Sequence, residues 1–243
     1  MRVLPIFVVL GTCLVTACGG SSSGSGADAA TDTPPTGGVK LSGTVKEIAA
    51  LATTPHAGVT LTAYNAADDS VLGTATSAAD GTFTLNAATG GAAIQGYLKA
   101  TTPGGTGNSA YKDSYLYPPT ALSADYAGIP VYILTVGTYG LANTVLGITQ
   151  DPANGWLALV IEDAAAAPVA GAVVTSTPAG QIAYNVSGRP SMSGIATEAD
   201  GIAYDTNVPP GQVTVSATKT GTTFASHAIK VRPDVVTLTL VTP

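Results

Sequence analysis

Two segments of this 243-residue chain repeat the same order of turns and strands. Pro55–Thr62 reads PHAGVTLT and Thr76–Phe83 reads TSAADGTF, while Pro168–Thr175 reads PVAGAVVT and Thr197–Tyr204 reads TEADGIAY. A Pro-x-Ala-Gly turn leads into a strand, because proline fixes φ and glycine admits an unusual φ. The Asp-Gly pairs are typical of hairpin turns. An internal repeat of this kind predicts two related domains.

Alternation of apolar and small polar residues follows each copy of the repeat. Val236, Leu238 and Leu240 alternate with threonines, and similar runs cover 94–101 and 212–218. A period of two with one apolar side predicts sheets that bury one face. We therefore expect an all-β protein of two tandem antiparallel β-sandwiches, over residues 39–137 and 155–243.

A different pattern separates the two expected sandwiches. Leu141, Val145 and Ile148 lie at helical spacing, and a turn-rich DPANG sequence follows them. This spacing predicts a short helix within a connector over residues 138–154. A helix with one apolar side should pack on a sandwich and hold the two domains in a fixed relation.

The repeated residues resemble a known family. The order strand, P-x-A-G-V-x-L-T, then T-x-x-x-D-G-x-F is similar to that of the carboxypeptidase regulatory-like domain, a transthyretin-like (prealbumin-like) sandwich. Pro55–Phe83 matches well, and Pro168–Tyr204 matches with a longer middle part. The resemblance implies non-catalytic modules of secreted and surface proteins.

The first residues indicate export from the cytoplasm. Arg2 precedes an apolar run over Val3–Leu14, which fits a signal peptide and is too short for a permanent membrane span. The run ends in LVTAC at Leu14–Cys18, which resembles the lipobox of bacterial lipoproteins. The resemblance implies that residues 1–17 are a signal peptide removed before Cys18, and that Cys18 carries diacylglycerol and palmitate. It also implies a cell envelope location, in the outer membrane of a Gram-negative bacterium.

Residues 18–38 contain many glycines and serines and no large apolar side chain beyond the cysteine. Such a composition predicts a disordered tether with nothing to bury. The expected mature protein is therefore a pair of sandwiches held on a membrane by a flexible segment.

Little in the sequence points to catalysis or metal binding. His56 and His227 are the two histidines, and neither has a second metal ligand at a useful spacing. No phosphate-binding loop, dinucleotide motif or cysteine pair is present, so no cofactor or metal is expected. The balance of 9 basic and 15 acidic residues gives a charge of −6, which argues against nucleic acid as a partner.

A tyrosine-rich stretch is the one suggestive feature. Tyr111, Tyr115 and Tyr117 lie in what reads as a polar, proline-containing loop. Exposed tyrosine rings could form a stacking platform for sugars, whereas the structural alternative is that they cover the edge of a sandwich.

These observations favour a non-enzymatic, surface-anchored lipoprotein that serves as a structural or interaction module of the cell envelope, with the membrane and an envelope protein or polysaccharide as partners. The first alternative is a carbohydrate-binding lipoprotein that uses the three tyrosines. A weaker alternative is a hydrolase with an unrecognised site.

Overall fold

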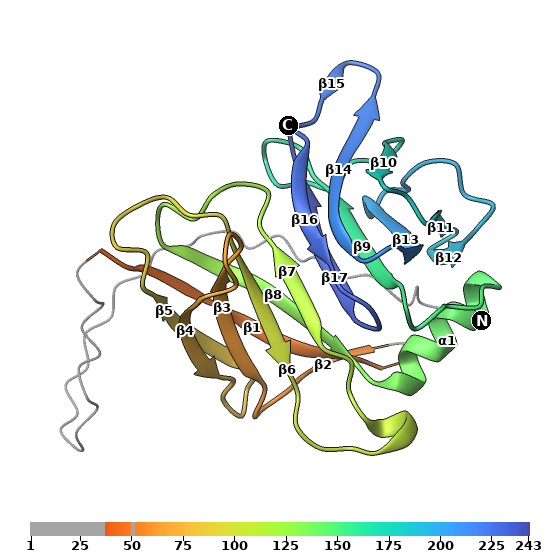
Figure 1. Cartoon of the computed structure of the whole chain (residues 1–243). Coiled ribbons are helices and arrows are strands. Elements are labelled where there is room, and N and C mark those ends of the chain that lie inside the picture. Colours follow the sequence, from red (N-terminus) through yellow and green to blue (C-terminus); the bar gives the residue numbers. More distant parts are fainter. Residues whose placement is uncertain (1–36, 50–51) are drawn as a thin grey trace, which may run out of the picture.

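The structure is a computed structural model that describes residues 37–49 and 52–243, and this part of the chain contains β-strands, one α-helix and one short 3-10 helix (Figure 1). The elements of the first half are β1 (Val39–Ala49), β2 (Ala52–Pro55), β3 (Thr60–Asn65), β4 (Val71–Thr76), β5 (Thr82–Ala87), β6 (Gly96–Thr101), η1 (Gly107–Ser109), β7 (Ser114–Tyr117) and β8 (Tyr126–Leu134). They are followed by α1 (Val136–Leu146), β9 (Gly155–Ile161), β10 (Val173–Thr177), β11 (Gln181–Val186), β12 (Arg189–Ser191), β13 (Ile202–Val208), β14 (Gly211–Lys219), β15 (Thr222–Thr223), β16 (His227–Val231) and β17 (Val236–Val241).

The described strands form three sheets. In the N-terminal sheet, β1 pairs antiparallel with β5 and β2 on one side and parallel with β8 on the other. In the C-terminal sheet, β14 pairs antiparallel with β10, β15 and β16. The third, central sheet has nine strands in the order β12-β11-β13-β9-β17-β7-β6-β3-β4. The protein is therefore mostly β, as expected.

The central sheet runs through both halves of the chain (Figure 1). Its junction is β17, which pairs in parallel with β9 of its own half and with β7 of the first half. The expectation of purely antiparallel, separate sheets is thus corrected: the pairs β1 with β8, β17 with β9 and β17 with β7 are parallel. The two parallel pairs that lie within one half, β1 with β8 and β17 with β9, arise because the last strand of each half returns beside the first strand of that half, in the same direction. The pair of β17 with β7 joins the two halves.

The two smaller sheets cover opposite faces of the central sheet. Side chains alternate along a strand, and Leu238 of β17 shares a face with Leu116 of β7, whereas Thr237 shares the other face with Leu157 of β9. Leu116 packs in the hydrophobic core under the N-terminal sheet, and Leu157 packs in the core under the C-terminal sheet. Each half is therefore a sandwich, and the two sandwiches share one sheet with their cores on opposite sides of it.

The repeat seen in the sequence is present in the hydrogen bonds. In the first copy, the buried Ser77 hydroxyl donates to the His56 carbonyl (2.8 Å) and accepts from the Val59 N–H (3.0 Å). In the second copy, the buried Thr197 hydroxyl donates to the Val169 carbonyl (2.6 Å) and accepts from the Ala172 N–H (2.9 Å). The same side-chain bridge thus holds the Pro-x-Ala-Gly turn in both copies.

The Asp-Gly turns also match. Gly81 and Gly201 have φ of 77° and 67°, in the left-handed region that favours glycine. An added Cβ would lie 2.5 Å from the Val45 carbonyl oxygen at Gly81 and 2.5 Å from the Ile161 carbonyl oxygen at Gly201. Glycine is required at both turns because the chain passes close to the first strand of each copy.

The helix between the halves confirms the expectation of a short connector helix and begins at Val136, before the predicted connector. Thr135 caps it by accepting a hydrogen bond from the Thr138 N–H (3.1 Å), and Gly147 ends it with φ of 69°. Tyr139 and Leu146 pack on Trp156 of β9, so the helix is fixed to the second half.

Candidate functional site

The three tyrosines predicted to form a platform lie in two places. Tyr111 is half-buried beside the N-terminal sheet, where its hydroxyl donates to Glu47 Oε2 (2.9 Å) and its ring lies edge-on to His56. Tyr115 and Tyr117 lie on β7, with 8% and 5% of their surface exposed. The expectation of a loop is thus corrected for Ser114–Tyr117, which is a strand, and the rings do not form one exposed platform.

Tyr115 and Tyr117 pack around an arginine from the other half of the chain. The guanidinium carbon of Arg232 lies 4.4 Å from the centre of the Tyr115 ring and 4.6 Å from that of Tyr97 on β6. Its Nη1 donates to the Tyr117 hydroxyl (2.8 Å), and its Nη2 donates to the Tyr97 hydroxyl (2.7 Å). Cation–π contact and charge-assisted hydrogen bonds therefore fix the same side chain.

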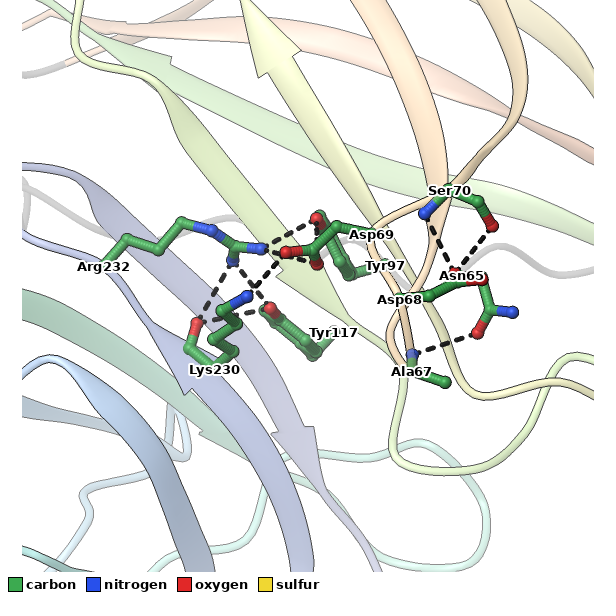
Figure 2. A network of polar contacts seen from close by, with 9 residues as sticks. All are labelled: Asn65, Ala67, Asp68, Asp69, Ser70, Tyr97, Tyr117, Lys230 and Arg232. Atoms are coloured by element: carbon green, nitrogen blue, oxygen red, sulfur yellow. Dashed lines mark hydrogen bonds and ion pairs between the residues drawn. The ribbon is translucent and has the colours of Figure 1, made fainter.

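Figure 2 shows how Asp69 completes this arrangement. Asp69 lies in the turn between β3 and β4, and its carboxylate accepts from the Tyr97 hydroxyl (2.9 Å), from Lys230 Nζ (2.5 Å) and from Arg232 Nη2 (3.2 Å). The Tyr117 hydroxyl donates to the Lys230 carbonyl (3.2 Å). We call this set the Arg232 cluster; it consists of Asp69, Tyr97, Tyr115, Tyr117, Lys230 and Arg232.

The turn that carries Asp69 is held by its own short polar side chains. Asp68 Oδ1 accepts from the Ser70 N–H (3.0 Å) and from the Ser70 hydroxyl (2.7 Å), and Asn65 Oδ1 accepts from the Ala67 N–H (3.0 Å) (Figure 2). Asp68 and Asp69 thus lie at the tip of the hairpin formed by β3 and β4. These hydrogen bonds within the turn hold the backbone that presents Asp69 to its partners.

Neighbouring groups determine the protonation states of the side chains in the Arg232 cluster. The hydrogen bond from Lys230, and then that from Tyr97, hold the pKa of the Asp69 carboxyl below its usual range. Burial, and then the hydrogen bond to Asp69, raise the pKa of Tyr97, and burial raises that of Tyr117. The tyrosines thus stay neutral donors between a carboxylate and two cations.

The sequence offered little warning of this cluster. Arg232 and Asp69 are 163 residues apart and belong to no shared motif. The one feature of the sequence that could have pointed to the cluster is the small number of charged residues, since only 10% of residues are Asp, Glu, Lys or Arg. In such a chain an arginine beside a buried strand is a candidate for a specific partner.

The histidines lie apart. His56 Nδ1 lies 3.1 Å from Glu47 Oε2, and His227 Nε2 lies 2.7 Å from the Thr239 hydroxyl. Burial lowers the pKa of His227. Within the described ranges, no group of three or more His, Cys, Asp and Glu side chains is arranged to hold a metal ion.

An apolar groove with two adjoining lobes lies beside β8. The first lobe, of about 300 Å³, is lined by the 116–126 segment, by Ile129 and Tyr132, and by Leu238 and Leu240. The second, of about 250 Å³, is lined by side chains that include Trp156, Tyr204, Tyr132 and Leu238. Tyr132, Val160 and Leu238 line both lobes. Of the three predicted tyrosines, Tyr117 lines the first lobe, together with Tyr97, Tyr126 and Tyr132.

Cys18, the predicted lipidation site, lies outside the described residues, as do the predicted signal peptide and most of the tether. In the part of the chain that the structure describes, none of the helices has the length and apolar character needed to cross a membrane.

Comparisons with known proteins assign no family to the chain. No family model matches it, and no curated protein matches it. Among solved structures, it is similar to the Bacillus anthracis TIE protein (14% identity, TM-score 0.25, 84% of this chain and 34% of that one). It is also similar to the shaft pilin SpaA of Lactobacillus rhamnosus GG (13%, 0.27, 85% and 97%) and to GBS52, a minor pilin of Streptococcus agalactiae (15%, 0.26, 84% and 95%).

The chain spans about a third of the length of the TIE protein. TM-scores of this size assign the chain to none of these folds or functions, and the description of the fold rests on its own strands.

Proposed function

We propose that this protein is a non-enzymatic structural module of the cell envelope: a stiff body of two transthyretin-like sandwiches, held on a membrane through lipid on Cys18. The observation that carries the proposal is the shared central sheet, in which β17 joins both halves by backbone hydrogen bonds. Backbone pairing resists relative motion more strongly than a flexible linker does.

The Arg232 cluster supports the same role. It joins the turn after β3 and the strands β6 and β7 of the first half to the end of β16 in the second half. These polar contacts between the halves are bonds within the chain, and the polar groups of the cluster are partners of one another. Such an arrangement suits a rigid spacer better than a site that turns over a substrate.

The anchor is proposed from the LVTAC sequence and the Gly/Ser-rich stretch behind it. A tether of about 20 flexible residues has a reach of roughly 25 Å, which lets the body stand clear of the membrane surface. Acylation through two or three chains makes such attachment stable.

Metabolic labelling with palmitate tests the anchor. We expect the wild-type chain to incorporate label and Cys18→Ala to lose it entirely. Cys13→Ala is a matched control, because it removes the other cysteine of the chain and should keep the label. Label that persists in Cys18→Ala, or disappears in Cys13→Ala, would refute the assignment.

A further inference from the structure

The two lobes of the groove beside β8 adjoin one another. Its lobes of about 300 and 250 Å³ share the wall formed by Tyr132, Val160 and Leu238. Pockets for small molecules typically measure about 300–1,000 Å³, and the two lobes together fall within that range. Because the lobes follow one another, an occupant that fills both must be elongated.

The walls of the groove are strongly apolar. Aliphatic side chains from the N-terminal and central sheets, and aromatic side chains from β6, β7, β8, α1, β9 and β13, surround the space; they include Leu41, Leu98, Leu116, Ile129, Leu134, Trp156, Ile202, Tyr204 and Leu240. Tyr126, at the first lobe, is 52% exposed and marks an opening to solvent. An apolar groove of this size that opens to solvent favours an apolar occupant, since the transfer of apolar surface out of water is favourable.

The charges of the groove select among apolar ligands. Asp125 lines the first lobe and Asp200 lines the second, and neither lobe is lined by a described Lys, Arg or His. Two carboxylates without a cation disfavour an anionic headgroup by like-charge repulsion. The groove therefore disfavours a fatty acid or a phospholipid anion, whereas an uncharged amphiphile meets no such repulsion.

Trp156 forms part of the wall of the second lobe and is 3% exposed. Its Nε1 atom is closed off from solvent, so the surface that Trp156 offers to an occupant is the apolar part of its ring.

From these observations we propose that the groove binds one molecule of a neutral, single-chain lipid, with its acyl chain along both lobes. The proposal does not depend on lipid at Cys18. It assigns a ligand class to a space that one of the three predicted tyrosines, Tyr117, lines.

Trp156 is the single tryptophan of the chain, so its fluorescence reports on the groove directly. The probe is a monoacylglycerol with a dibrominated acyl chain, because bromine quenches tryptophan only at close range. The Cys18→Ala chain is used, so that no attached acyl chain competes. We expect saturable quenching with one lipid per chain; no quenching at lipid concentrations below micelle formation would overturn the proposal.

Two variants of the groove and one control variant, compared with the parent protein, localise the binding. Val160→Phe fills the point where the lobes meet and should weaken binding about tenfold or more. Val173→Phe, the same change at a side chain that is 42% exposed on β10, is the control and should bind like the parent. Tyr126→Ser, at an exposed position, should weaken binding without affecting the fold. Equal affinity in all four proteins would place the lipid elsewhere.

A dibrominated fatty acid tests the charge argument. At pH 8 the carboxylate should bind at least about tenfold more weakly than the neutral monoacylglycerol, because Asp125 and Asp200 repel it. Equal affinity for the two probes would refute the neutral ligand class. Binding of the fatty acid alone would overturn the proposal as a whole.

Discussion

The two copies of the repeat share their turns and differ at one edge. β8 in the first copy and β17 in the second are equivalent, since each pairs in parallel with the first strand of its own copy. The outer edge of β17 pairs with β7, whereas β8 has no such partner strand among the described residues. One sandwich edge is thus used to join the halves, and its counterpart is left for the groove.

The sequence of β8 explains the difference. Its pairing with β1 shifts register between Leu41 and Gly43, Gly128 has φ of 78°, and Pro130 has no N–H to offer a neighbouring strand. Bulges and prolines are the usual means by which a sheet edge avoids further pairing. β17 has no such interruption, so its edge is regular and pairs with β7. Because the edge of β8 is blocked, pairing of this kind occurs at one copy only and gives a closed body of two sandwiches.

The largest effect is expected where β17 joins the halves. Thr237 is fully buried and pairs with Tyr115 on one side and Leu157 on the other, so Thr237→Pro removes a ladder hydrogen bond inside the central sheet. We expect a loss of about 4 kcal/mol or more in the free energy of unfolding. Urea unfolding followed by circular dichroism should change from one transition to two.

The reciprocal substitution Pro130→Thr provides the control for that prediction. It lies on the blocked edge and should alter the free energy of unfolding by less than about 1 kcal/mol. A similar loss in both variants would mean that the two edges do not differ in the way described.

The Arg232 cluster should contribute the next largest effect. Arg232→Ala leaves Tyr97 and Tyr117 without their donor and removes one partner of Asp69, so we expect a loss of about 2–3 kcal/mol in the free energy of unfolding. Arg189→Ala removes an exposed arginine and should change it by less than about 0.5 kcal/mol. Equal losses in the two variants, measured by urea titration, would contradict the role of the cluster.

The two copies can be compared directly through their bridging hydroxyls. Ser77→Ala and Thr197→Ala each leave a buried N–H and a carbonyl without a partner, so each should cost about 1–3 kcal/mol of stability. The conservative change Thr197→Ser keeps the hydroxyl and should restore most of that loss. If only one of the two alanine variants were destabilised, the two bridging hydroxyls would not contribute equally to stability, although their hydrogen bonds are the same.

The smallest effect is a dependence on pH. The pKa of Asp69 is lowered, so its contribution to stability is present above the ordinary value of 3.8 and is lost as pH falls through the lower folded value. The stability difference between the wild type and Asp69→Asn should therefore be larger at pH 7 than at pH 3. A difference that is the same at both pH values, in thermal unfolding, would show that ionised Asp69 is not stabilising.

The candidate site was predictable only in part. The periodicity of the sequence located the strands at 212–218 and at Val236, which the structure has as β14 and β17. The strand Ser114–Tyr117 was taken for loop, because four residues between polar and proline-rich flanks give too short a pattern. We therefore expected its tyrosines at the surface. In the structure this segment is β7, which pairs with β17, and Tyr115 and Tyr117 are buried.

By itself, the sequence determined the local features of this protein: the repeated turns, the glycines that allow them, the alternation that buries one face of each strand, and the capped helix. These depend on residues close together in the chain, whose preferences act over a few positions. Only the tertiary structure decided that β7 pairs with β17, that Arg232 meets Asp69, and that a groove is left beside β8. Those contacts join residues more than a hundred positions apart, and nothing in a local pattern states which of several compatible edges will pair.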